Sequence, residues 1–256
     1  MLQSGSGEER TPVDRTFVRA LVVVVSALAV AGTACTEGGD AEADPGGTPS
    51  GPRSEDAETV TPIPEGQSLM DPGSYLAQTE PAITLTTITP WYGAANVPRF
   101  VVFGQLDHFP YAELYLLNLE QVVRNPGDPG DPWKLRQPPD DLLGWLVDHA
   151  GMEVVGEVAP VEIGGFPGQQ VDLRVPSDAG CAPEHARPFP EACLLFFTLP
   201  GEPLVFPLAK GMAYRITVVP EVAGETVTIL YADYAQRFDE RVEAADEVVR
   251  SIEFDV

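Results

Sequence analysis

The stretch ETVTILYADYAQRFDERVEAADEVVRSIEF (Glu225–Phe254) combines two patterns that bear on the fold class of the chain. Its first part is rich in β-branched and aromatic residues, which is typical of a strand over Thr226–Ala232. In the second part apolar residues recur every three or four positions, which predicts a helix from about Phe238 to Ile252. The residues of this apolar stripe are Phe238, Val242, Ala245, Val249 and Ile252.

Further segments have strand-like patterns, and short turns containing Gly and Pro separate several of them. In Gln169–Val175 and Met212–Val218, residues of the two faces alternate with a period of two. Turns this short join antiparallel neighbours, because parallel neighbours need crossovers of a dozen or more residues. The other strand candidates are Ile83–Thr87, Phe100–Phe103, Glu113–Leu119, Glu157–Ile163, Cys193–Thr198 and Leu204–Leu208.

A second helix is predicted over Asp141–Ala150, where Asp140 is a suitable N-cap and Gly151 a suitable left-handed stop. Together the patterns predict the α+β class: one antiparallel β-sheet with two main helices packed on it. We expect this to be a single domain over residues 71–256, which is an ordinary domain size.

Two stretches resemble domains of actinobacterial lipoproteins and secreted proteins. They are GGFPGQQVDLRV (Gly164–Val175), with a G-G-x-P-G turn, and Glu225–Phe254, with an F-D-x…A-D-x-V-x-x-S-I-x-F helix. That group is similar in layout to PsbP-like α/β/α sandwiches built around an antiparallel sheet. The resemblance covers roughly Asp140–Val256. Its motifs are structural, so it implies a fold and carries over no functional residue.

The N-terminus has the pattern of an export signal, expected over residues 1–34. The uncharged run Ala20–Thr36 follows Arg15 and Arg19, and it is shorter than the roughly 20 apolar residues of a spanning helix. Gly32-Thr33-Ala34-Cys35 resembles the bacterial lipobox, which implies a diacylglycerol on the Cys35 thiol. The alternatives are ordinary cleavage after Ala34, which would give a secreted protein, and a short membrane anchor.

Residues 35–70 are expected to form a disordered acidic tether. The segment Thr36–Ser68 has eight carboxylates, one arginine, many Gly and Pro residues and no aromatic residue. Such a segment buries too little apolar area to compensate for its ordering entropy. A flexible coil of this length has a reach of about 30 Å, enough to hold a domain clear of a bilayer.

The charge of the chain restricts its partners. There are 39 acidic and 15 basic residues, a formal net charge of −24, and the lysines are Lys134 and Lys210. Nucleic-acid binding needs clustered Lys and Arg, so a nucleic-acid binder is disfavoured. Anionic lipid headgroups would repel the same surface, so the membrane is expected as a partner only through the lipid on Cys35. No cofactor is indicated.

Cys181 and Cys193 remain once Cys35 is assigned to the lipid. Outside the cytoplasm such a pair is expected to form a disulfide. Closing a loop of about 13 residues would stabilise the fold by roughly 3 kcal/mol in the chain-entropy model. The alternative is a metal site of Cys181, His185 and Cys193, which lacks the paired short spacings of structural zinc motifs.

Two other chemistries have candidate residues in the sequence. Ser177, Asp178 and His185 have the residue types of a hydrolase, but the sequence has no G-x-S-x-G, S-x-x-K or H-E-x-x-H motif. Asp128 and Asp131 are hard oxygen ligands on a proline-rich loop, which makes calcium the other candidate. Two carboxylates fall short of the six to eight oxygens that calcium prefers.

The sequence therefore favours a lipid-anchored, extracytoplasmic binding or accessory module of the cell envelope, without an identifiable catalytic role. The partner, an envelope protein or a small ligand, is not specified by the residues. Trp91, Tyr92 and Trp133 are candidate contact residues, because aromatic anchors dominate many interfaces. The alternative for them is packing against the sheet, which is the commoner fate of a Trp side chain.

Overall fold

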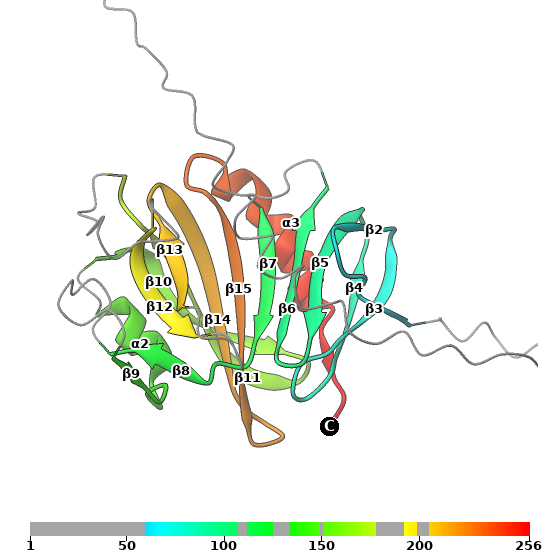
Figure 1. Cartoon of the computed structure of the whole chain (residues 1–256), viewed down its shortest axis with the longest axis horizontal. Coiled ribbons are helices and arrows are strands. Elements are labelled where there is room, and N and C mark those ends of the chain that lie inside the picture. Colours follow the sequence, from blue (N-terminus) through cyan, green and yellow to red (C-terminus); the bar gives the residue numbers. More distant parts are fainter. Residues whose placement is uncertain (1–59, 107–111, 125–133, 149–150, 178–191, 199–204) are drawn as a thin grey trace, which may run out of the picture. The chain divides into compact units, whose positions relative to one another are not determined.

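The computed structural model describes residues 60–106, 112–124, 134–148, 151–177, 192–198 and 205–256, which Figure 1 shows as coloured ribbons. Strands predominate in this part of the chain. In chain order the elements are β1 (Thr61–Pro62), β2 (Ser68–Met70), β3 (Gly73–Ala77), β4 (Ile83–Thr87), β5 (Trp91–Val97), β6 (Phe100–Gln105), β7 (Glu113–Leu117), β8 (Gln121–Val123), β9 (Leu135–Arg136), α2 (Leu142–Val147), β10 (Glu153–Ile163), β11 (Phe166–Arg174), β12 (Ala192–Thr198), β13 (Val205–Ala209), β14 (Met212–Val222), β15 (Glu225–Tyr234), α3 (Phe238–Arg250) and β16 (Glu253–Phe254).

The described strands form three sheets. The largest has eight strands in the order β10-β11-β14-β15-β7-β6-β5-β2, and every neighbouring pair in it is antiparallel. A four-stranded sheet has the order β1-β3-β4-β16, with β1 and β3 running parallel. A second four-stranded sheet has the order β13-β12-β8-β9. We call the eight-stranded sheet the main sheet.

The main sheet is covered on both faces, because the side chains of its central strands alternate between two apolar layers. On one face Tyr231 of β15 packs on Phe238 of α3, with ring centroids 5.7 Å apart. Leu85 of β4 belongs to the same buried cluster. On the other face Ile216 of β14 and Leu230 of β15 lie beside α2 and the β13-β12-β8-β9 sheet.

The predicted fold class, α+β with two main helices on one sheet, is wrong. Within the described residues the helices have only 6 and 13 residues, and most other elements are strands in three sheets. The extra sheets are built largely from strands of two to five residues, such as β1, β8 and β9. Strands this short show no period of their own, and their hydrogen bonds come from partners distant in sequence.

The longer predicted elements are confirmed. β4 spans Ile83–Thr87, and α3 begins at Phe238, with its whole apolar stripe buried. α2 is shorter than predicted, because it ends at Val147 and its N-cap is Asp141, whose Oδ1 accepts a 2.8 Å hydrogen bond from the Gly144 N–H. Within the described residues, no helix is long and apolar enough to cross a membrane.

The turn predicted over Gly164–Gly168 is present but shorter, because Phe166, Pro167 and Gly168 already belong to β11. Ile163 of β10 pairs with Phe166 of β11, so the two glycines alone form the turn. Their φ angles are +55° and +82°. Two-residue turns with positive φ at both positions match the twist of the flanking strands, and glycine adopts these angles without a steric penalty.

Ion pairs fix α3 across three strands of the main sheet. Arg215 of β14 contacts Asp172 of β11 at 2.7 Å and also pairs with Asp246 of α3. Asp233 of β15 is completely buried, and Arg241 of α3 reaches it at 3.3 Å. Charged groups this poorly exposed require partners, so these pairs favour one position of the helix over others.

Strand β10 is one edge of the main sheet, and three of its features oppose further strand pairing. Its register with β11 shifts between Val155 and Ala159, which marks a bulge. Pro160 has no N–H to donate, and Glu157 is exposed beside the bulge. Bulges, prolines and charges are the usual means of protecting an edge strand.

The tether expected over residues 35–70 extends too far, because its last part belongs to the fold. Ser68–Met70 pairs with β5 as β2, and Met70 is completely buried. The Asn96 side-chain amide donates a 3.0 Å hydrogen bond to the Ile63 carbonyl, and Ile63 is 2% exposed. The burial of Ile63 and Met70, together with these hydrogen bonds, holds the end of this segment on the core.

Replacement of Gly93 tests this packing. A Cβ on Gly93 of β5 would lie 2.1 Å from the Pro64 carbonyl oxygen, which requires the backbone of the N-terminal segment to move. We expect Gly93→Ala to lower the free energy of unfolding by about 2 kcal/mol or more, measured by urea denaturation. Gly73→Ala is the matched control, because its Cβ would meet no atom closer than 3.9 Å. Equal stability of the two variants would contradict the packing.

Candidate binding site

A groove of about 260 Å³ lies on the face of the main sheet opposite α3, at the β14–β15 hairpin. Three segments distant in sequence form it: the chain after β7, the residues leading into α2, and the hairpin itself. Prolines and the capped start of α2 limit the backbone freedom of its walls. The lining residues are Leu119, Pro138, Pro139, Asp140, Leu142, Val218, Pro220, Gly224, Glu225 and Thr226.

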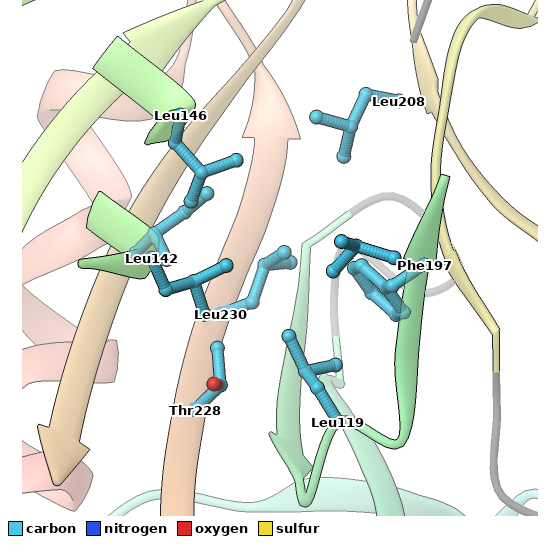
Figure 2. Close-up of a pocket in the computed structure, with 9 residues that line it drawn as sticks. Leu119, Leu142, Leu146, Phe197, Leu208, Thr228 and Leu230 are labelled. Atoms are coloured by element: carbon cyan, nitrogen blue, oxygen red, sulfur yellow. The ribbon is translucent and has the colours of Figure 1, made fainter. Parts of the chain in front are cut away.

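A smaller apolar pocket lies next to this groove and shares Leu119 and Leu142 with it (Figure 2). Its free volume is about 10 Å³, roughly the space of one water molecule. Leu142 and Leu146 enter it from α2, one helical turn apart, and Leu230 enters from β15. The other lining residues are Val122, Phe197, Leu208, Ile216 and Thr228.

Thr228 contributes the single polar side-chain atom among the residues that line the apolar pocket. The residue is 2% exposed, and its Oγ1 has no hydrogen-bond partner among the described residues. Along β15 it lies between Thr226, which lines the groove, and Leu230, which lines the pocket. Its hydroxyl oxygen is buried, and the residue does not line the groove.

The groove is electrostatically negative. Asp140 and Glu225 line it, and Asp140 is exposed. Arg99 reaches Glu225 at 3.4 Å, but it is also shared with Glu80 at 3.6 Å, so one cation faces two carboxylates there. Asp140 adds a further negative charge.

A buried carboxyl with two neighbouring tyrosines lies on the same face of the main sheet. Glu113 of β7 is 6% exposed, and the Tyr115 hydroxyl donates a hydrogen bond to its carboxylate. Burial raises the pKa of Glu113 to about 7, and the hydrogen bond from Tyr115 opposes this rise. Tyr214 of β14 is buried nearby and accepts a 2.7 Å hydrogen bond from the Ala209 N–H.

Sequence reasoning missed Glu113, although a signal was present. In the predicted strand Glu113–Leu119, the glutamate shares a face with Tyr115 and Leu117. A carboxylate on the apolar side of a strand is unusual enough to mark a perturbed group. The groove had no such signal, because its walls come from separate parts of the chain.

The candidate contact aromatics differ in their surroundings. Trp91 is completely buried and packs edge-to-face on Phe103, with ring centroids 5.2 Å apart. It therefore packs in the core and does not form a surface contact. Tyr92 is half-buried on the opposite face of β5. Trp133 lies outside the described residues.

Most of the other candidate residues also lie outside the described part. Ser177 is described and is exposed in a turn after β11. Cys193 lies on β12, but its side chain is not described. Within the described residues, no group of three or more His, Cys, Asp or Glu side chains could hold a metal ion. The candidates outside the described part are Cys35, Asp128, Asp131, Asp178, Cys181 and His185.

No family model and no curated protein matches the chain. Two solved structures are similar to it at 13% sequence identity. Cyanobacterial PsbP (CyanoP) from Synechocystis sp. PCC 6803 has a TM-score of 0.38, and the match covers 73% of this chain and 93% of that one. LpqN, involved in cell envelope biogenesis of Mycobacterium tuberculosis, has a TM-score of 0.27, with coverages of 77% and 88%. The resemblance to actinobacterial lipoprotein domains stays a prediction.

Replacement of Glu113 tests the buried carboxyl. Its pKa is about 7 in the folded protein against an ordinary value of 4.5, so its protonated form favours folding. This stabilisation is fully present below about pH 4.5 and is lost as the pH rises to 7. The free energy of unfolding therefore falls by about 3 kcal/mol over this range. We expect Glu113→Gln to increase the free energy of unfolding above pH 7 and to flatten its decline between pH 4.5 and 7, measured by urea denaturation.

Tyr115→Phe is the companion variant, because it removes the hydrogen bond that opposes the rise in pKa. We expect it to shift the decline in stability to higher pH. If the pH profile of Glu113→Gln matched that of the unsubstituted protein, the carboxyl would not have a raised pKa.

Proposed function

We propose that this chain is a binding or accessory module of the cell envelope, located outside the cytoplasm and anchored by a lipid on Cys35. The observation that carries the binding role is the groove of about 260 Å³ beside the apolar pocket. Small-molecule sites are typically concave and mostly apolar, with a few polar groups, and begin at about 300 Å³. The groove is close to this size, and its exposed lining is divided about evenly between polar and apolar atoms.

The walls of the groove support a binding role. They are set by the β14–β15 hairpin, by Pro138 and Pro139, and by the N-cap of α2 at Asp141. A site on elements held in this way changes little when it is occupied, which lowers the entropic cost of binding. The carboxylates of Asp140 and Glu225 give it polar groups at its opening.

The anchoring part of the proposal rests on the sequence. The lipobox-like Gly32–Cys35 follows the apolar core of the export signal, and the described fold begins at residue 60. The segment between has a composition that favours a flexible coil with a reach of about 25 Å. The Cys181–Cys193 disulfide is part of the same proposal, since it requires an oxidising compartment. Cleavage without lipidation would make the protein a secreted form of the same module.

Replacement of Cys35 tests the anchor. In producing cells we expect the unsubstituted protein to incorporate labelled fatty acid and to enter the detergent phase on phase separation. Cys35→Ala should lose the label, because it lacks the thiol that accepts the lipid. Thr36→Ala keeps that thiol and should behave like the unsubstituted chain. Label that persists in Cys35→Ala, or an unlabelled unsubstituted protein, would refute the lipid anchor.

A neutral fluorophore tests the groove. N-phenyl-1-naphthylamine, whose emission rises in apolar surroundings, should bind the folded domain in a saturable way. Thr226 is exposed at the groove, so Thr226→Trp should occupy the space and reduce the saturable signal. Thr61→Trp, on exposed β1, is the matched control and should bind as the unsubstituted domain does. Equal binding by both tryptophan variants would exclude the groove as the site.

A further inference from the structure

Asn118 lies where the hydrogen-bond ladder between β7 and β15 ends, and the groove begins at the same place. The last pair of that ladder is Leu117 with Thr228. Beyond this pair, Leu119 and Thr226 both line the groove, on opposite sides of the ladder's end. Asn118 therefore stands between the regular sheet and the groove wall that contains Leu119.

The side chain of Asn118 is completely buried, and its amide holds two other segments. Its Oδ1 accepts a 3.0 Å hydrogen bond from the Glu80 N–H, and its Nδ2 donates to the Glu80 carbonyl at 2.5 Å. Nδ2 also donates a longer hydrogen bond, of 3.5 Å, to the Thr226 carbonyl. A buried amide is unfavourable unless its donors and its acceptor are paired, so these bonds favour one position of Asn118.

The backbone of Asn118 is fixed at the same point. Its N–H donates a 3.0 Å hydrogen bond to the carbonyl of Arg99, in the turn between β5 and β6. Arg99 has a φ of +69°, a left-handed conformation that residues other than glycine adopt rarely. The Arg99 N–H in turn donates to the Gln78 carbonyl at 2.9 Å. The groove wall is thus connected through Asn118 to the β5–β6 turn and to the segment after β3.

Other contacts of the β14–β15 hairpin are less directional. Arg99 and Glu225 form an ion pair at 3.4 Å, but their side chains are 31% and 42% exposed, and ion pairs at the surface contribute little. Val222 and Val227 are completely buried in the core on the α3 side, and apolar contacts of this kind are non-directional. Asn118 adds a directional contact between the hairpin and the wall opposite it.

We propose that Asn118 is a positioning residue of the groove, an inference that rests on the binding role proposed above. Its amide sets the separation of Leu119 and Thr226, and with it the width of the groove at the end of the ladder. Asn118 does not line the groove, so it acts on a ligand through these two residues. Walls that are fixed before the ligand arrives lower the entropic cost of binding.

Alanine replacement of two buried asparagines separates positioning from general stability. Asn96 is the matched control, because it is 2% exposed, and its amide accepts from the Gln78 N–H at 2.8 Å and donates to the Ile63 carbonyl away from the groove. We expect both variants to unfold at lower urea concentrations. Asn118→Ala should bind N-phenyl-1-naphthylamine about fivefold more weakly than Asn96→Ala does. Equal affinity of the two variants would overturn the proposal.

Hydrogen–deuterium exchange measures the groove walls without a ligand. In Asn118→Ala the amides of residues 119–121 and 225–227 should exchange faster than in Asn96→Ala, and equal rates would contradict the positioning role. Asn118→Asp is a second variant for the case that Asn118→Ala does not fold. It keeps the acceptor for the Glu80 N–H and loses both donated hydrogen bonds, so the same faster exchange is expected.

The two proposals fail in different ways. If Thr226→Trp left probe binding unchanged, the binding role of the groove would be refuted, while the exchange rates would still show whether Asn118 fixes its walls. If Thr226→Trp blocked the probe but the Asn118 variants bound and exchanged as Asn96→Ala does, the binding role would stand and the positioning role would be refuted.

Discussion

Burial of the central strands on both faces is the constraint on which this structure depends. Every residue from Val227 to Asp233 of β15 is buried, so successive side chains need apolar cover on opposite sides of the sheet. α3 and the β1-β3-β4-β16 sheet belong to one layer, and α2 and the β13-β12-β8-β9 sheet to the other. The layer that contains α2 consists of short elements, and the groove lies where they leave the main sheet uncovered beside the β14–β15 hairpin.

The layers on the two faces of the main sheet are held to it by different interactions. On the α3 side, Arg215 and Arg241 pair with carboxylates of the strands and the helix, and these directional contacts set the position of the helix. On the α2 side the described lining is leucine, valine, isoleucine and phenylalanine around Thr228. Apolar contacts are non-directional, so this side is better suited to admit another apolar group.

The sequence predicts secondary structure where the apolar residues of a segment recur with a regular period. The stripe of α3, the alternation of β11 and β14 and the presence of a turn at Gly164 are local properties, and the local sequence predicts them. The fold class was predicted wrongly, because strands such as Thr61–Pro62 are defined by their partners. The groove was not predictable for the same reason, since Leu119, Pro138 and Glu225 meet only after folding. Glu113 was the exception, a buried carboxyl with a raised pKa that its own strand pattern would have revealed.

The irregular edge strand β10 matters most if molecules are held close together at a surface. Under the lipid anchor proposed above, copies would be confined to a plane and would meet far more often than molecules free in three dimensions. A regular strand at the sheet margin would allow neighbouring copies to join into a continuous ribbon. The bulge between Val155 and Ala159, together with Pro160, interrupts the hydrogen-bond ladder on which such a ribbon would grow. Copies that approach through this edge therefore do not extend the main sheet into one another.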